Sequence, residues 1–169
     1  QDLISQIYQK TFGLKIIITR MFSYTNARRD NLFQTAFARQ IAMIENNKQK
    51  KLFHGNLKSI RTFIDIEDAM NAYWLTAKNG KIGEIYNIGG GAELSNIDLT
   101  LLILNQLGKN ETYINYVTDR KGHDLRYSVN IDKISTELGY SPKKRFTESL
   151  PETIQWYINN EKWWRPLKK

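Results

Sequence analysis

The sequence contains no cysteine and only two histidines among its 169 residues. Without cysteine the chain can form neither a disulfide nor a thiolate metal site, and His54 and His123 are too few for a convincing imidazole site. No apolar run is long enough to span a membrane, and the first residues lack the basic and apolar blocks of a signal peptide. We therefore expect a cytoplasmic protein with no metal site and no membrane partner.

Negative charge is also scarce, because 25 Lys and Arg residues outnumber 17 Asp and Glu residues and leave a net charge of +8. A solvated basic surface would explain this excess, and so would an anionic partner. No zinc finger, RNA-recognition signature or basic heptad accompanies the positive residues. The composition therefore favours an anionic small molecule over a nucleic acid.

The first part of the chain has the pattern of a helix followed by a buried strand. Apolar residues recur with helical spacing over Asp2–Thr11, and Gly13 follows as a stop. Residues Leu14–Met21 are mostly apolar and rich in isoleucine, which predicts a strand buried on both faces. Because the chain opens inside a helical pattern and without Met, we interpret it as part of a longer chain.

The rest of the sequence alternates helical and strand patterns, so we expect the α/β class: the last strands and helix of a doubly wound sheet plus a small α+β domain. Ser23–Asn31 is polar and predicts a loop. Further helices are predicted over Leu32–Glu45, from Asp65 or Asp68 to Leu75, from Ser95 to Gly108, at Ile131–Gly139 and from Glu148 to Trp163. Further strands are predicted at Lys51–His54, Gly83–Gly89 and Tyr113–Val117.

Arg61 lies in an apolar, strand-like run that leads into an amphipathic helix. A half-buried arginine needs an anionic partner, and its rigid guanidinium suits phosphate. The alternative is an exposed arginine on an edge strand. We favour the phosphate contact.

A second polar cluster, Asp119–Tyr127, contains Arg120, His123 and Arg126 around a glycine. Such a loop can wrap an anion and bind sugar hydroxyls, although a solvated turn would have the same composition. A third group, Ser23–Arg29, follows the predicted buried strand, where open α/β sheets bind ligands. By contrast, Gly89–Gly91 lacks the spacing of a dinucleotide or phosphate loop and predicts a tight turn.

These segments resemble the extended short-chain dehydrogenase/reductase family, which includes nucleotide-sugar dehydratases, epimerases and reductases. Residues Asp119–Tyr127 are similar to the Asp-Arg-Pro-Gly-His-Asp-Arg-Arg-Tyr segment of the dehydratases, with Lys121 in place of proline. Phe22, Arg28 and Arg29 match the Phe-Asn-His-x-x-Pro-Arg-Arg loop of the GDP-mannose 4,6-dehydratase branch, with Ser23 in place of the substrate-binding asparagine. The end of the chain, Val117–Trp164, is more similar to dTDP-glucose 4,6-dehydratase.

The resemblance implies a Rossmann-type domain that binds NAD or NADP and lies mostly outside this chain. Residues 1–31 would be its tail, and residues 32–169 would form mostly the nucleotide-sugar-binding domain. The family's catalytic Tyr-x-x-x-Lys would lie upstream of Gln1, so we name no catalytic residue here.

The resemblance also implies roles for individual residues. Arg61 would bind the diphosphate, and Ser23 and Tyr24 would line the sugar side. Arg120, His123 and Arg126 would lie near the nucleotide or sugar. Arg28 and Arg29 would reach a neighbouring subunit and its cofactor, which implies a homodimer or homotetramer.

The function implied is the substrate-binding half of a nucleotide-sugar dehydratase, similar to GDP-mannose 4,6-dehydratase. Such an enzyme moves hydride from sugar C4 to C6 and eliminates water across C5 and C6. A 4-epimerase or a 4-keto reductase of the same family is the first alternative. A non-catalytic nucleotide-sugar-binding or assembly module is the second, and a nucleic-acid-binding domain is the weakest.

Overall fold

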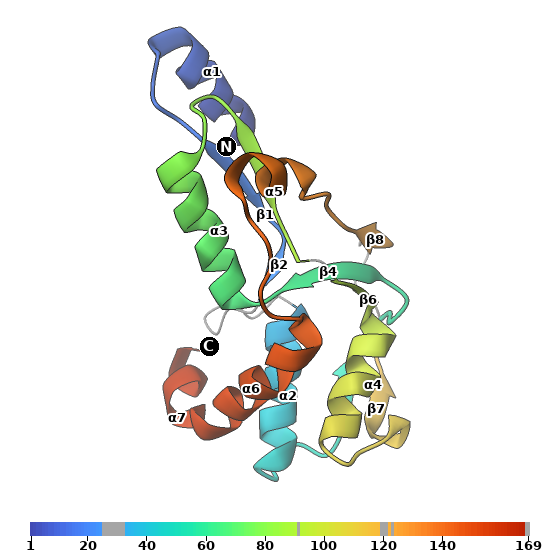
Figure 1. Cartoon of the computed structure of the whole chain (residues 1–169). Coiled ribbons are helices and arrows are strands. Elements are labelled where there is room, and N and C mark those ends of the chain that lie inside the picture. The colour runs from blue at the N-terminus through green and yellow to red at the C-terminus, as the bar shows by residue number, and fades with distance from the viewer. Residues whose placement is uncertain (25–32, 91, 119–121, 123, 168–169) are drawn as a thin grey trace.

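A computed structural model describes residues 1–24, 33–90, 92–118, 122 and 124–167 (Figure 1). The helices are α1 (Asp2–Phe12), α2 (Phe33–Glu45), α3 (Ile66–Asn79), α4 (Asn96–Gln106), α5 (Asp132–Leu138), α6 (Phe146–Asn159) and α7 (Glu161–Trp164), with 3-10 turns at Glu111–Tyr113 and Arg165–Leu167. The strands are β1 (Ile18–Met21), β2 (Ser23–Tyr24), β3 (Leu52–His54), β4 (Ile60–Ile64), β5 (Ile85–Ile88), β6 (Ala92–Ser95), β7 (Ile114–Tyr116) and β8 (Arg126–Tyr127). The predicted α/β class is confirmed.

The strands form three small sheets. β1 and β5 pair in parallel, and so do β3 and β7. The third sheet is built on β4, which pairs in parallel with β2 and β8 and antiparallel with β6. β6 occupies one edge of β4, along residues 60–63. β2 and β8 therefore share the other edge of β4: β8 pairs with residues 60–61, and β2 pairs with residues 63–64.

The sheet around β4 lies between two parts of the molecule (Figure 1). On one side, β1, β5, α3 and α5 surround a core that includes Ile64, Tyr86 and Ile134. On the other side, α2, α4 and α6 surround a core that includes Phe63. Successive residues of a strand point to opposite faces, so Phe63 and Ile64 place β4 in both cores at once.

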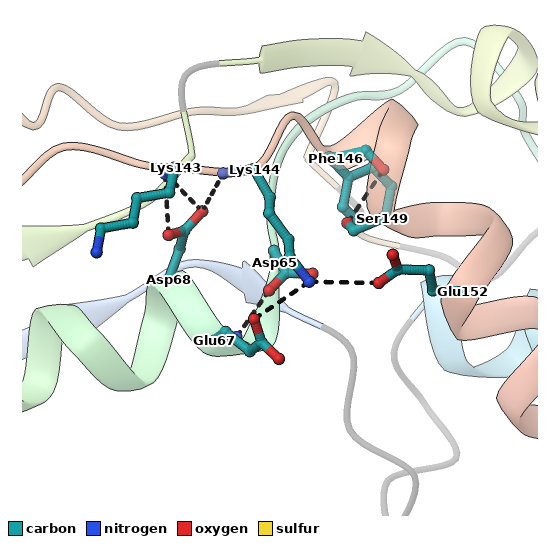
Figure 2. Close-up of polar contacts among 8 residues, drawn as sticks. All are labelled: Asp65, Glu67, Asp68, Lys143, Lys144, Phe146, Ser149 and Glu152. Carbon is teal, nitrogen blue, oxygen red and sulfur yellow. Dashed lines mark hydrogen bonds and ion pairs between the residues drawn. The ribbon is translucent and has the colours of Figure 1, made fainter.

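A cluster of polar contacts fixes the start of α3 to the loop that leads into α6 (Figure 2). Asp65 is the N-cap of α3 and accepts a hydrogen bond of 2.8 Å from the Glu67 amide. The buried Asp68 carboxylate accepts hydrogen bonds of 3.0 Å from the amides of Lys143 and Lys144. Of the two predicted capping residues, Asp65 therefore caps α3, and Asp68 connects α3 to the loop before α6.

Lys144 adds a second link at the same place. Its ammonium lies 3.1 Å from Glu67 on α3 and 3.3 Å from Glu152 on α6 (Figure 2). The hydrogen bond to Glu67, followed by that to Glu152, raises the pKa of Lys144 above its ordinary value. The ammonium is therefore charged at neutral pH and bridges the two helices.

Most predicted elements are confirmed within a few residues of their ends, but the prediction for Leu14–Met21 is partly wrong. β1 begins at Ile18, Arg20 is exposed, and the other residues are only half-buried. Among the described residues β1 has one strand neighbour, β5, so part of its apolar surface is uncovered. Ser23 and Tyr24 form a strand where a loop was predicted, because they pair with the end of β4.

α1 is also less covered than its sequence predicted. None of its side chains is buried, and Leu3 and Phe12 are 72% and 65% exposed. An ion pair of 2.6 Å between Asp2 and Arg20 ties the helix to β1. No helix of the described residues is long and apolar enough to cross a membrane.

Candidate functional site

The β4 sheet brings together the four site residues that were predicted from sequence and that lie within the described part of the chain. Ser23 and Tyr24 form β2, Arg61 lies in β4, and Arg126 begins β8. The register pairs Ser23 with Phe63, Tyr24 with Ile64, and Tyr127 with Arg61. The predicted Arg28, Arg29, Arg120 and His123 lie outside the described residues.

The register also divides these residues between two faces of the sheet, because paired residues of adjacent strands point to the same side. Arg61 shares its face with Leu94 of β6, Tyr127 of β8 and Phe63. Arg126 is paired with Ile60, so it lies on the opposite face, together with Ile60 and Thr62. Arg61 and Arg126 therefore belong to neighbouring strands but to different environments.

Within the described part of the chain, Arg61 is held by backbone oxygens. Nη1 donates to the Ile60 carbonyl and Nη2 donates to the Asp124 carbonyl, each at 2.8 Å. No carboxylate of the described residues pairs with this partly exposed guanidinium. Carbonyl partners orient an arginine without neutralising it, so Arg61 keeps its full charge for an anion.

Two buried polar atoms near Arg61 lack partners among the described residues. Ser59 and Asn96 are 1% and 6% exposed, and within the described part of the chain neither Ser59 Oγ nor Asn96 Oδ1 has a hydrogen-bond partner. The Asn96 amide donates to the Ser59 carbonyl, which continues the antiparallel register of β4 and β6 and puts both side chains on the Arg61 face. Unpaired buried polar atoms are costly, so such a pair near an arginine without a described carboxylate partner is typical of a ligand site.

Sequence reasoning missed Ser59 and Asn96. Ser95-Asn96-Ile97-Asp98 was read as the capping box of a helix, and Ser95 does accept a hydrogen bond from the Asp98 amide as the N-cap of α4. The following asparagine carried no visible signal, because β6 itself was not predicted. Only the pairing of β4 with β6 shows that Asn96 lies opposite Ser59.

The other face of the sheet holds a paired charge. Glu93 receives hydrogen bonds from Arg126 Nε at 3.1 Å and from Nη2 at 2.8 and 2.9 Å, and the Ser128 hydroxyl also donates to it. The Arg126 bonds, followed by Ser128, lower the pKa of Glu93, and the Glu93 bond raises the pKa of Arg126. The nearby Thr62 hydroxyl is buried and has no hydrogen-bond partner among the residues that the structure describes.

The remaining predicted residues line the β2 edge. Tyr24 is half-buried and packs against the core of β5 and α3, while Ser23 is half-buried beside Phe63. Just before them, the Phe22 ring stacks on Tyr127 with centroids 4.5 Å apart. This contact connects the residue that follows β1 to the second residue of β8.

Gly90 is packed against β4 and does not line an open phosphate loop. A Cβ built on this glycine would lie 1.9 Å from the Phe63 carbonyl oxygen. Gly91 lies outside the described residues, so the tight turn predicted for Gly89–Gly91 stays a prediction. No group of three or more His, Asp or Glu side chains among the described residues could hold a metal ion.

A cavity of about 690 Å³ lies away from Arg61, near the carboxyl ends of α2 and α4, and is lined by Glu45, Lys51 and Lys109 among others. Lys109 pairs with Glu45 and lies over the Tyr113 ring. Lys109 lies just after the carboxyl end of α4, where a lysine is stabilising without a ligand, and the Lys51 ammonium donates to the Thr112 carbonyl. We therefore place the candidate site at Arg61 and not in this cavity.

Comparison with known proteins agrees with the resemblance noted in the sequence. A family model described as GDP-mannose 4,6 dehydratase matches residues 1–153. The dTDP-glucose 4,6-dehydratase of Streptomyces niveus is 35% identical over 167 residues, which cover 99% of this chain and 49% of that protein. The chain spans about half the length of the curated relatives it matches.

Solved structures are similar over the same half. DesIV, the dTDP-glucose 4,6-dehydratase of Streptomyces venezuelae, solved with NAD, superposes with a TM-score of 0.89 at 36% identity, covering 99% of this chain and 51% of that one. The UDP-glucuronic acid 4-epimerase of Bacillus cereus, in complex with UDP-glucuronic acid and NAD, gives 0.80 at 26% identity, covering 95% and 50%. The fold is thus Rossmann-type, as predicted.

The relatives refine one prediction. They are named for dTDP-glucose and not for GDP-mannose, so the predicted similarity to GDP-mannose 4,6-dehydratase extends to the family and not to its substrate. The chain belongs to the GDP-mannose 4,6-dehydratase family of nucleotide-sugar dehydratases, within the short-chain dehydrogenases/reductases.

Proposed function

We propose that this chain is the nucleotide-sugar-binding half of an NAD(P)-dependent 4,6-dehydratase, and that Arg61 binds the diphosphate. One observation carries the proposal: Arg61 has no carboxylate partner among the described residues and lies beside the unpaired polar atoms of Ser59 and Asn96. A nucleoside diphosphate offers anionic oxygens for the guanidinium and polar base atoms for its neighbours. The names of the curated relatives favour dTDP-glucose as the substrate over GDP-mannose.

The three side chains have complementary chemistry. The guanidinium can turn from the carbonyls of Ile60 and Asp124 to two oxygens of a diphosphate, which are stronger acceptors. Asn96 Oδ1 is an acceptor suited to an N–H of the base, and the Ser59 hydroxyl can donate or accept. Ser23 and Tyr24, together with Arg120 and His123, remain predictions for the nucleotide and sugar. Arg126 was predicted near the same groups, but its charge is matched by Glu93, so we propose an indirect role for it.

We place the NAD or NADP site on a dinucleotide-binding unit outside these 169 residues, because the chain covers about half of the NAD-bound DesIV structure and its Gly89–Gly91 run lacks the spacing of a dinucleotide loop. When bound, the nicotinamide supplies the hydride chemistry. The proposed role of the present residues is to hold the nucleotide sugar. Arg28 and Arg29 remain predicted contacts to a neighbouring cofactor in a dimer or tetramer.

The uncovered surface of α1 and β1 supports such a unit. Leu3, Ile7 and Phe12 are more than half exposed, and β1 has a single described strand neighbour. Exposed apolar side chains and an open strand edge favour association with another α/β layer. We propose that the dinucleotide-binding unit extends this sheet and that residues 1–31 belong to it. This surface also argues against a free-standing, non-catalytic module.

A 4-epimerase is the second candidate, because the Bacillus cereus UDP-glucuronic acid 4-epimerase shares the fold of this half at 26% identity. Both enzymes would bind a nucleotide diphosphate through this half. The substrate-binding residues therefore distinguish them less well than the reaction product does. Incubation of the complete enzyme, including its dinucleotide-binding unit, with dTDP-glucose and NAD would yield a 4-keto-6-deoxy sugar from a dehydratase and a C4 epimer from an epimerase.

The proposal is tested by calorimetric titration of the purified protein with dTDP, UDP and GDP. We expect saturable binding of at least one nucleoside diphosphate, with dTDP the tightest, and loss of that binding in Arg61→Ala. Equal binding by the wild-type protein and a folded Arg61→Ala variant would contradict the assignment.

A further inference from the structure

Glu93 and Arg126 reach toward each other from the two strands that flank β4. Glu93 lies on β6 in register with Thr62, and Arg126 lies on β8 in register with Ile60. The Glu93 carboxylate accepts hydrogen bonds from Arg126 Nε and Nη2 and from the Ser128 hydroxyl. One carboxylate thus fastens residues 126–128 across the face of β4 that is opposite Arg61.

β8 needs such a fastening because it has only two residues, both exposed. Its backbone link to β4 includes a 2.8 Å hydrogen bond from the Ile60 amide to the Leu125 carbonyl. A short edge strand with so few ladder bonds separates easily from its neighbour. The side chains of Arg126 and Ser128 give it an anchor that the backbone alone lacks.

The segment that contains β8 also orients the Arg61 side chain. The Asp124 carbonyl, two residues before Arg126, accepts a 2.8 Å hydrogen bond from Arg61 Nη2. If β8 left the edge of β4, this carbonyl would move and the guanidinium would lose one of its two fixed contacts. A guanidinium that must be reordered on binding loses part of its affinity for an anion.

We propose that Glu93 is a positioning residue for Arg61: through Arg126 and Ser128 it holds residues 124–128 against β4 and so keeps the guanidinium preorganised for a diphosphate. The functional part of this inference rests on the proposed function of Arg61. Glu93 does not itself meet the ligand, because its carboxylate is already engaged and would repel a diphosphate. Arg126 then serves the site indirectly, because its guanidinium is paired with the Glu93 carboxylate.

The first test is independent of any ligand. Hydrogen exchange by mass spectrometry, on a peptide containing the Ile60 amide, measures how often β8 leaves β4. We expect faster exchange in Glu93→Gln and in Arg126→Gln than in the wild-type protein. The matched control is Glu84→Gln, which removes a comparably exposed ion pair, Glu84–Lys133, away from β8. Unchanged exchange at Ile60 in Glu93→Gln would overturn the proposal.

The second test measures calorimetric binding of dTDP. We expect Glu93→Gln and Arg126→Gln each to weaken binding about fivefold, and the double variant to weaken it no further, because coupled residues are non-additive. Glu84→Gln should bind like the wild type. If Arg126→Gln weakened dTDP binding while Glu93→Gln bound dTDP like the wild type, Arg126 would be a direct ligand contact, and the positioning role of Glu93 would be overturned.

The two tests separate this inference from the proposed function. If the wild-type protein bound no nucleoside diphosphate while Glu93→Gln still accelerated exchange at Ile60, the proposed function would fail and the fastening of β8 by Glu93 would stand. If binding were normal and exchange unchanged, the proposed function would stand and the positioning role would fail.

Discussion

Arg61 and Arg126 lie on neighbouring strands of one small sheet, yet their surroundings differ. Arg126 has its charge matched by Glu93 on β6, whereas Arg61 is held by two backbone carbonyls and faces no described carboxylate. The difference separates two uses of the same side chain. An arginine with its own carboxylate stabilises the fold, while an arginine oriented by carbonyls retains its charge for an anion.

The strand beneath both arginines should show the largest effect on stability. Phe63 is buried between α2, α4 and α6, and its ring stacks on Phe146 with centroids 5.0 Å apart. We expect Phe63→Ala to lower the free energy of unfolding by about 3–5 kcal/mol, measured by urea denaturation. Loss of less than ~1 kcal/mol would mean that β4 is not the shared element of the two cores.

Replacement of the two arginines should then separate their roles in binding. Charge-assisted hydrogen bonds contribute about 1.5–3 kcal/mol, so Arg61→Ala should weaken dTDP binding by roughly 10- to 100-fold. Arg126→Gln should weaken it by about fivefold through the displaced β8. Calorimetry on both variants, with folding checked by circular dichroism, measures the contrast. Equal losses would erase the distinction between them.

Asn96 extends the comparison to the neutral atoms of the Arg61 face. Its Oδ1 is buried with no partner in the described part of the chain, so Asn96→Ala should remove one ligand hydrogen bond and weaken dTDP binding roughly fivefold, or by about 1 kcal/mol. Since the side chain has no described partner to lose, stability should change little. A large drop in thermal stability with unchanged affinity would assign Asn96 to the fold.

The Glu93–Arg126 ion pair should make a pH-dependent contribution to stability. Because Arg126 and Ser128 lower the folded-state pKa of Glu93, the contribution is present above the ordinary glutamate value of 4.5 and is lost as the pH falls through the lowered folded-state value. The difference in thermal stability between wild type and Glu93→Gln should therefore shrink on acidification from neutral pH. A difference that grew in acid would contradict this sign.

The smallest effect is expected at Arg145, whose weak ion pair with Glu148 spans 3.9 Å on an exposed surface. Exposed pairs of this kind contribute about 0–1 kcal/mol. Arg145→Ala should leave both dTDP affinity and thermal stability within about that range of wild type. A strong loss of affinity would move the anion site to the Lys143–Arg145 loop.

The sequence was most informative where a residue's environment is local. Helix ends followed from Gly13, Asp65 and Gly139, because caps depend on neighbouring residues. The run around Arg61 predicted both the strand and the cation in it. Family resemblance added the fold of the whole chain, which local patterns alone left open.

Long-range pairing set the limit of sequence reasoning. β6 and β8 are too short to show a period, and both exist through pairing with β4. The division of Arg61 and Arg126 between two faces therefore could not be predicted, and neither could the juxtaposition of Ser59 with Asn96. The partial exposure of β1 likewise depends on which strands flank it in space.

Arg61, and not Arg126, is proposed to supply the charge that binds a nucleoside diphosphate. Parallel calorimetric titration of wild type, Arg61→Ala and Arg126→Gln with dTDP at one ionic strength tests this assignment. We expect Arg61→Ala to lose roughly 10- to 100-fold in affinity, clearly more than Arg126→Gln. Wild-type affinity in a folded Arg61→Ala variant would contradict it.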